Sequence, residues 1–186
     1  MRLTTREVEA ILRSGEVIVP LKEDADILFQ SGYGTLREDK SGVLSRCETL
    51  YLVAEKRVKF LERAKGAEVT FQSLLERFRI EDPKIWTRYL IFLDLRSRGY
   101  VVKEGVGRGI DFRVYARGTY HVKAAKYVVF AVCEGNPIPA NMLSEVLWMV
   151  QGMKKELIVA VADRRGEIVY YSLSWLNLGL RLRNTE

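Results

Sequence analysis

The chain has 186 residues, and 48% of them are hydrophobic, which is enough apolar surface for one large or two small cores and argues against disorder. Its longest apolar runs, 127–133 and 157–162, are far shorter than the roughly 20 residues that cross a bilayer. The first residues also lack the apolar region of a signal peptide. We therefore expect a cytoplasmic protein that does not associate with membranes.

Basic residues outnumber acidic ones by 30 to 24, which gives a net charge of +6 and a pI of about 9.3. This charge is compatible with a polyanionic partner such as RNA. Because the two signs are interspersed, the same charge is also compatible with a solvated, ion-paired surface. Cys47 and Cys133 stand in apolar contexts, and the chain has one histidine, so we expect core cysteines and neither a metal nor a cofactor.

The first half, residues 1–82, is predicted to be a small mixed α/β domain. The pattern predicts strands at 16–19 and 58–60, and helices at 24–30, 45–54 and 71–78. Ser45 has the character of a helix N-cap, and a glycine-rich break at 31–34 precedes a charged turn at 37–40.

A boundary is predicted at residues 80–83, where Pro83 disfavours helix in the residue before it. The second half, residues 83–186, is predicted to contain helices at 86–98 and 139–150, the first of them ended by Gly99. Strands are predicted at 100–103, 110–116, 127–133, 157–162 and 168–173. This order of elements indicates a mixed sheet flanked by helices.

The last predicted strand, 168–173, is apolar on both faces. Such a strand either lies inside a sheet or pairs with another chain, because an exposed edge of this kind promotes aggregation. We favour a subunit interface.

One block carries a specific resemblance. It runs Arg98-Gly99-Tyr100-Val101-Val102-Lys103, continues through Gly105 and Gly109, and ends in Asp111-Phe112-Arg113-Val114-Tyr115. This block resembles the conserved core of the archaeal tRNA-splicing (tRNA-intron) endonuclease family. The similarity extends through the turn at Asp163 to the strand 168–171, and more loosely through 32–34 and 48–53.

The resemblance implies an α+β protein: an N-terminal mixed α/β domain, then a restriction-endonuclease-like α/β/α domain with a mixed central sheet. It implies metal-independent cleavage of precursor tRNA at bulge-helix-bulge introns, which leaves 2′,3′-cyclic phosphate and 5′-hydroxyl ends. The reaction needs a base for the 2′-hydroxyl, an acid for the leaving 5′-oxygen and a cation beside the phosphorane. The family uses a tyrosine, a histidine and a lysine.

Tyr115 and Lys155 match the family tyrosine and lysine. His121 is the candidate histidine, but it stands upstream of the family position, which corresponds to 123–125 here. The family segment His-Ser-Val-Arg-Lys is replaced by 151–155, Gln-Gly-Met-Lys-Lys. These two departures favour a structural subunit that completes the assembly and positions RNA. The alternative is a catalytic subunit with a Tyr115, His121 and Lys155 site.

Four residues are candidates for RNA contact. Trp148 could stack on an unpaired base or lie in the core, and the core is our preferred interpretation. Lys154 takes the place of the family arginine, and Arg164 and Arg165 could bind phosphates.

The loop 133–137 carries a single acid, whereas the family uses an acidic loop there to dock into a partner. We therefore expect a heterotetramer with a second, related subunit, with a homo-oligomer as the alternative. A metal-dependent nuclease of the restriction-enzyme type is disfavoured, because the strand after Asp111 lacks the acidic pattern that such a site needs.

Overall fold

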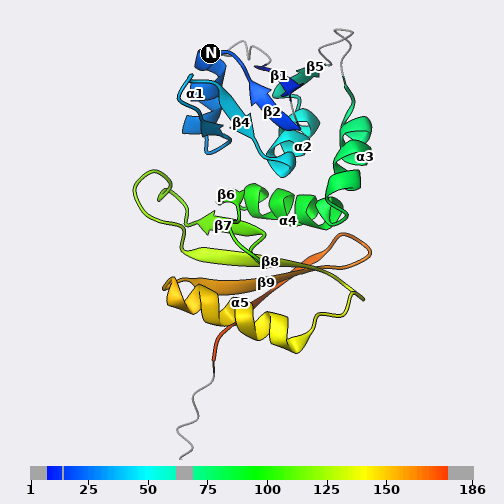
Figure 1. The fold of residues 1–186 in the computed structure, drawn as a ribbon, viewed down its shortest axis with the longest axis vertical. Helices are drawn as coiled ribbons and strands as arrows, with labels where there is room; N and C mark the ends of the chain where they lie inside the picture. The colour runs from blue at the N-terminus through cyan, green and yellow to red at the C-terminus, as the bar shows by residue number, and fades with distance from the viewer. Residues whose placement is uncertain (1–7, 14, 62–68, 176–186) are drawn as a thin grey trace, which may run out of the picture.

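The computed structural model describes residues 8–13, 15–61 and 69–175. Each half of the chain forms a five-stranded sheet, and the N-terminal half lies above the C-terminal half in Figure 1. The predicted class, two mixed α/β halves, is confirmed. No helix among these residues is long and apolar enough to span a membrane.

The N-terminal sheet has the strand order β3-β4-β2-β1-β5, with only β1 and β5 parallel among its paired strands. Its strands are β1 (Val8–Arg13), β2 (Glu16–Val19), β3 (Thr35–Leu36), β4 (Gly42–Leu44) and β5 (Val58–Leu61). Its helices are α1 (Lys22–Gln30), α2 (Arg46–Ala54) and α3 (Phe71–Glu81). The sequence pattern did not predict β1, β3 or β4. β3 and β4 have two and three residues, so pairing with β2 rather than local periodicity defines them.

The start of α2 confirms the predicted cap. The Ser45 side chain accepts a hydrogen bond from the Glu48 N–H, and the Glu48 side chain accepts one from the Ser45 N–H, which completes a capping box. This arrangement satisfies two backbone donors that the helix itself leaves free. It also orients the Glu48 carboxylate, which is buried.

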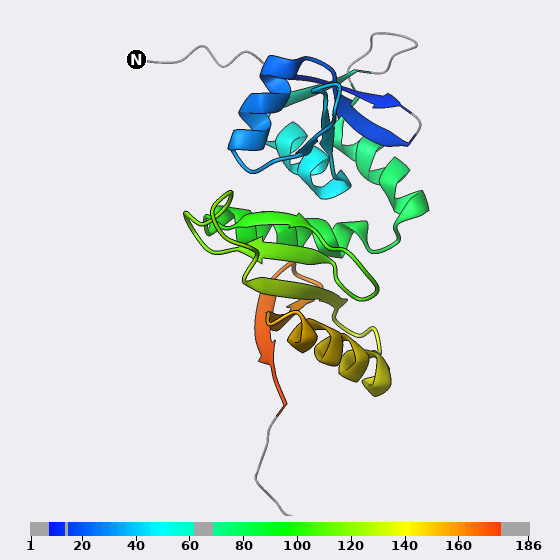
Figure 2. The same ribbon diagram turned by 60° about the vertical axis from the view of Figure 1, so that its left-hand side comes forward.

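The C-terminal sheet has the order β10-β9-β8-β7-β6, with β8 and β9 parallel and the other pairs antiparallel. The strands are β6 (Val101–Glu104), β7 (Phe112–Tyr115), β8 (Tyr127–Cys133), β9 (Glu156–Ala162) and β10 (Ile168–Leu173). Helix α4 (Ile85–Ser97) covers one face and α5 (Ala140–Gly152) the other, as Figure 2 shows. This is the predicted α/β/α arrangement.

Helix α4 contributes to the contact between the two halves. Its buried residues, such as Phe92, belong to one continuous core that includes the N-terminal helices and the adjacent face of the C-terminal sheet. A second, smaller core lies between α5 and the opposite face. Residues 82–84 connect α3 to α4. The division into domains 1–82 and 83–186 stays a prediction.

The less favoured interpretation of strand 168–173, a position inside a sheet, is wrong. β10 is the edge strand of the C-terminal sheet, and Val169 and Tyr171 are 50% and 56% exposed. α5 packs over β9, and the side of β10 that carries these two residues extends past it. The favoured interpretation, pairing with another chain, stays a prediction.

Candidate active-site rim

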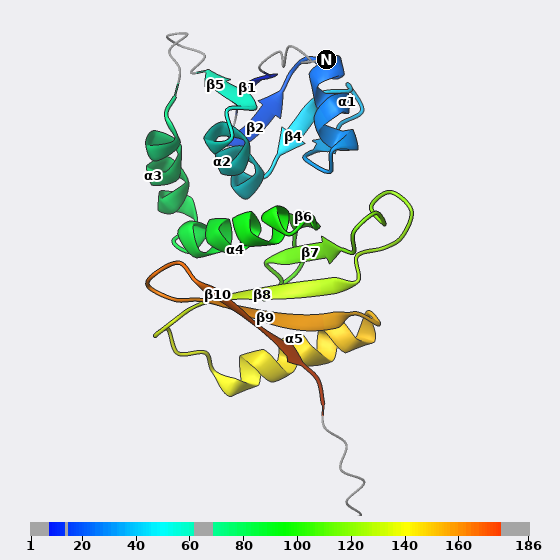
Figure 3. The same cartoon turned by 180° about the vertical axis from the view of Figure 1, so that it is seen from behind.

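The strand register places Tyr115 and Lys155 at the same end of the C-terminal sheet. Val114 pairs with Tyr127, and Tyr127 pairs with Glu156, so the end of β7 lies beside the starts of β8 and β9. Tyr115 is the last residue of β7, and Lys155 immediately precedes β9. We call this end the rim. In Figures 1 and 3 it lies on the side of the sheet below α1.

Lys155 is held against the segment that leads into β8. Lys154 adopts a left-handed backbone with φ of 55°, and the Lys155 N–H donates to the Val150 carbonyl. The Lys155 ammonium donates to the carbonyl oxygen of Ala125 at 2.5 Å. The residue whose carbonyl this ammonium contacts is thus an alanine, and the residue before it, Ala124, is an alanine as well.

Tyr115 is half-buried, and its ring meets the edge of the Tyr120 ring at a centroid distance of 4.9 Å. Burial raises the pKa of Tyr120. Tyr120 in turn lies 4.0 Å from the ring of His121. In the loop between β7 and β8, consecutive ring contacts therefore connect Tyr115 through Tyr120 to His121.

His121 has a positive φ of 69° and an exposed side chain. The centre of its ring lies 4.9 Å from that of Phe29 in α1, so the β7–β8 loop contacts the N-terminal half. The structure brings Tyr115 and Lys155 to one rim and places His121 on the loop above it.

A buried ion pair, which the sequence did not reveal, joins the halves behind this loop. The Lys103 ammonium lies 2.9 Å from the Glu48 carboxylate and donates to the Gly34 carbonyl at 2.6 Å. Burial lowers the pKa of Lys103. The Lys103 ammonium also lies 5.7 Å from the centre of the Tyr120 ring, so the buried ion pair contacts the β7–β8 loop as well.

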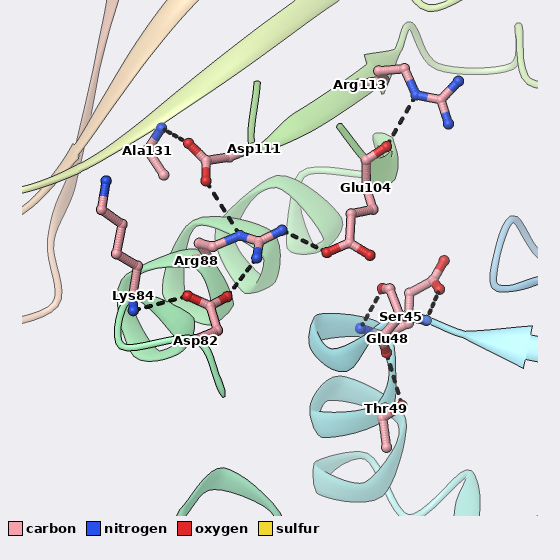
Figure 4. A network of polar contacts seen from close by, with 10 residues as sticks. All are labelled: Ser45, Glu48, Thr49, Asp82, Lys84, Arg88, Glu104, Asp111, Arg113 and Ala131. Carbon is pink, nitrogen blue, oxygen red and sulfur yellow. Dashed lines mark hydrogen bonds and ion pairs between the residues drawn. The ribbon is translucent and has the colours of Figure 1, made fainter. Parts of the chain in front are cut away.

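A second polar network fixes the start of α4 to the sheet (Figure 4). Arg88 pairs with Asp82 at 2.5 Å, with Glu104 at 2.7 Å and with Asp111 at 3.4 Å. Asp111 accepts a hydrogen bond from the Ala131 N–H, and burial raises the pKa of its carboxyl. These contacts position both ends of the glycine-containing segment of the conserved block.

The two spaced glycines of that segment have packing reasons. A Cβ at Gly105 would lie 2.0 Å from the Ile110 carbonyl oxygen. Gly109 has φ of 75°, and a Cβ there would lie 2.4 Å from Val146 in α5. Neither position accepts a side chain without movement of the backbone or of α5.

The residues predicted to contact RNA do not gather in one place. Lys154 is exposed at the rim. Arg164 and Arg165 lie in the turn after β9, whose seven residues span roughly 20 Å from Lys155. The preference for Trp148 in the core is wrong, because its side chain is 77% exposed on the outer face of α5.

The cysteines are not ligands of a recognisable site. Cys47 is buried and Cys133 half-buried, and burial raises the pKa of the Cys47 thiol. Within residues 8–13, 15–61 and 69–175 no group of three His, Cys, Asp or Glu side chains could hold a metal ion.

Sequence comparisons identify both halves. The profile of the tRNA intron endonuclease catalytic C-terminal domain matches residues 85–170, and that of the N-terminal domain matches residues 8–75. The chain belongs to the tRNA intron endonuclease family. The resemblance predicted from the conserved block is thus confirmed, and it extends through both halves.

Relatives named tRNA-splicing endonuclease align over most of the chain. The protein of Methanococcus vannielii is 32% identical over 173 residues, which cover 93% of this chain and 97% of the relative. That of Pyrococcus furiosus is 30% identical over 164 residues, 87% and 93% of the two chains. The Methanosarcina acetivorans protein is 30% identical over 161 residues, which are 86% of this chain but 44% of that relative.

Proposed function

We propose that this chain is a subunit of a tRNA-splicing endonuclease that acts on precursor tRNA at bulge-helix-bulge elements, and that it serves assembly and RNA positioning rather than cleavage. Family membership of both halves supports the first part. The net charge of +6 is compatible with an RNA partner.

The observation that carries the structural role is the surroundings of Lys155. Its ammonium donates to the carbonyl of Ala125, which lies in the segment 123–125 where the family histidine is expected and which here reads Lys-Ala-Ala. A general acid must come within about 2.6–3.2 Å of the leaving oxygen or act through one water. The imidazole of His121 lies instead against Phe29 and Tyr120.

In the proposed assembly a related subunit that keeps the imidazole performs the cleavage. Its tyrosine removes the proton of the 2′-hydroxyl, which attacks the phosphorus, and its histidine protonates the leaving 5′-oxygen. The products are a 2′,3′-cyclic phosphate and a 5′-hydroxyl. The altered segment 151–155 and the single acid in 133–137 support a heterotetramer with such a partner.

A second candidate is a catalytic role for this chain, favoured by the shared rim of Tyr115 and Lys155 and by the ring path from Tyr115 through Tyr120 to His121. In that case Tyr115 is the base, His121 the acid and Lys155 the cation. This reading requires the β7–β8 loop to move the imidazole off Phe29 when RNA binds.

The test uses the purified chain, EDTA and an end-labelled bulge-helix-bulge RNA. The structural role predicts a shifted RNA band without cleavage, and cleavage to cyclic-phosphate ends only after a second family member is added. Cleavage by the chain alone that is abolished by His121→Ala would establish the catalytic role. Failure to bind or cleave this RNA, alone or in the mixture, would contradict both candidates.

A further inference from the structure

A hollow of about 350 Å³ lies at the end of the C-terminal sheet opposite the rim. Its walls come from the first two turns of α4, the ends of β8 and β9, and the β9–β10 turn: Trp86, Thr87, Leu90, Cys133, Ala162 and 163–166. We call it the Trp86 hollow. Figures 1 and 3 show the β9–β10 turn beneath the start of α4, away from the β7–β8 loop. Its volume is within the range of about 300–1,000 Å³ that is typical of small-ligand sites.

The β9–β10 turn is held in one conformation. Asp163 Oδ1 accepts hydrogen bonds from the N–H groups of Arg165 and Glu167, both at 2.8 Å. The Asp163 N–H donates to the Glu167 carbonyl at 3.0 Å, and Gly166 has φ of 87° beside Leu90 of α4. The Asp163 carboxylate is therefore hydrogen-bonded to the backbone of the turn, and the backbone that carries the two arginines is held in place.

Arg164 and Arg165 have exposed side chains. Among the described residues neither guanidinium has an ion pair or hydrogen bond, whereas Arg88 pairs with three carboxylates. A guanidinium offers five N–H donors in a planar fork that suits the oxygens of a phosphate. Two such groups at one hollow favour an anionic ligand.

Trp86 supplies an aromatic surface in the same hollow. Its side chain is 48% exposed, and its ring is supported by the buried Tyr89 at a centroid distance of 5.7 Å. Because Trp86 lies in the first turn of a 13-residue helix, the positive end of that helix adds to the charge of the arginines. An anion joined to a flat ring matches this combination.

We propose that the Trp86 hollow binds an unpaired nucleotide, with the base stacked on Trp86 and the phosphate held by Arg164 and Arg165. Unpaired RNA is recognised in this way, by stacking on aromatic rings together with arginine contacts to the backbone. The inference rests on the proposed function for its substrate class. The nucleotide in the hollow lies roughly 20 Å from Lys155, so it is a nucleotide that anchors the RNA and not one that is cut at this rim.

The direct test follows the fluorescence of Trp86 in a Trp148→Phe/Trp175→Phe background, where it is the remaining tryptophan of the chain. The titrants are a six-nucleotide oligouridylate and a hexaglutamate peptide. The proposal predicts a saturable change with the oligonucleotide and none with the peptide. A change with the peptide alone would make the hollow a docking site for an acidic protein segment and would overturn the proposal.

The matched variants are Arg164→Ala/Arg165→Ala and the control Arg77→Ala/Arg79→Ala. The control removes the same charge from exposed positions on α3, and native thermal unfolding is checked for both. We expect the first variant to weaken oligonucleotide binding at least tenfold at 0.1 M salt and to reduce the salt-dependence slope by about one. The control should stay within twofold of the parent. Equal losses of oligonucleotide affinity in both variants would show that the loss depends on net charge alone, and would overturn the proposal.

A parallel mobility shift with bulge-helix-bulge RNA separates this proposal from the proposed function. Binding of that RNA with no difference between the two double variants contradicts the hollow and leaves the function intact. A Trp86 signal with oligouridylate in a chain that does not bind the bulge-helix-bulge RNA supports the hollow and contradicts the function.

Discussion

Replacing Lys103 with methionine removes the ammonium from the buried contact between the two halves. The side chains of Lys103 and Glu48 are 7% and 3% exposed, so the variant leaves the carboxylate inside the protein without its cation. Glu48 keeps hydrogen bonds from the N–H groups of Gly34 at 3.0 Å and Ser45 at 2.8 Å. The Gly34 carbonyl loses the donor that lies 2.6 Å away.

These contacts determine how much free energy of unfolding the Lys103→Met variant is expected to lose. Two unit charges about 3 Å apart attract each other by roughly 5–6 kcal/mol at an effective dielectric constant of about 20, and desolvation of the ammonium offsets part of this. Removal of one partner from a buried pair typically costs about 3–5 kcal/mol. Since two hydrogen bonds to Glu48 remain, we expect a loss of about 3 kcal/mol for Lys103→Met.

The assay is urea unfolding of Lys103→Met, Glu48→Gln and the double variant, extrapolated to water. Lys126→Met is the control, because Lys126 and Glu156 form an ion pair at 3.2 Å with both side chains about half exposed. Its loss should cost less than about 1 kcal/mol. A loss from Lys103→Met no larger than that from Lys126→Met, or a cycle without coupling between Lys103 and Glu48, would contradict this expectation.

Gly32→Ala should lower the free energy of unfolding by about 2 kcal/mol, because φ is 81° and the new Cβ would lie 2.8 Å from the Val101 side chain. The control Gly15→Ala, with φ of 82° but no atom within 4 Å of the new Cβ, should lower it by about 1 kcal/mol. Equal losses in urea unfolding would contradict a role for the contact with Val101. Burial raises the pKa of Asp111, so its contribution to stability falls as pH rises from about 4 through that raised pKa. The unfolding free energy of Asp111→Asn minus that of the parent should therefore rise from pH 4 to pH 7. A difference that stays constant or falls over this range would contradict the expected direction. Trp148→Ser should change stability by less than about 0.5 kcal/mol but weaken binding of bulge-helix-bulge RNA severalfold, and unchanged affinity would remove Trp148 from the RNA surface.

Much of the fold could be predicted because its longer elements carry strong local signals. The strand 127–133 is a continuous apolar run, and β8 has those bounds. Ser45 marked the start of α2, and Gly99, with φ of 84°, marked the end of α4. The two short strands β3 and β4 escaped prediction because their pairing with distant residues defines them.

The candidate site could be predicted only in part. Tyr115 and Lys155 lie at the same rim because neighbouring strands end at a common edge of the sheet, and the order of the elements in the sequence indicates this. The pair of Lys103 with Glu48 joins residues 55 positions apart, and no local pattern encodes it. A signal did exist for Trp148: the buried positions Val146, Leu147 and Val150 form the stripe of α5, and Trp148 lies about 200° from Val146.

The most direct test of the structural role is the cleavage rate of bulge-helix-bulge RNA by the mixed assembly, with a tyrosine-to-phenylalanine change placed in one subunit at a time. We predict that Tyr115→Phe in this chain leaves the rate within twofold, whereas the matching change in the partner abolishes cleavage. A hundredfold loss from Tyr115→Phe would contradict the account and assign the chemistry to this chain.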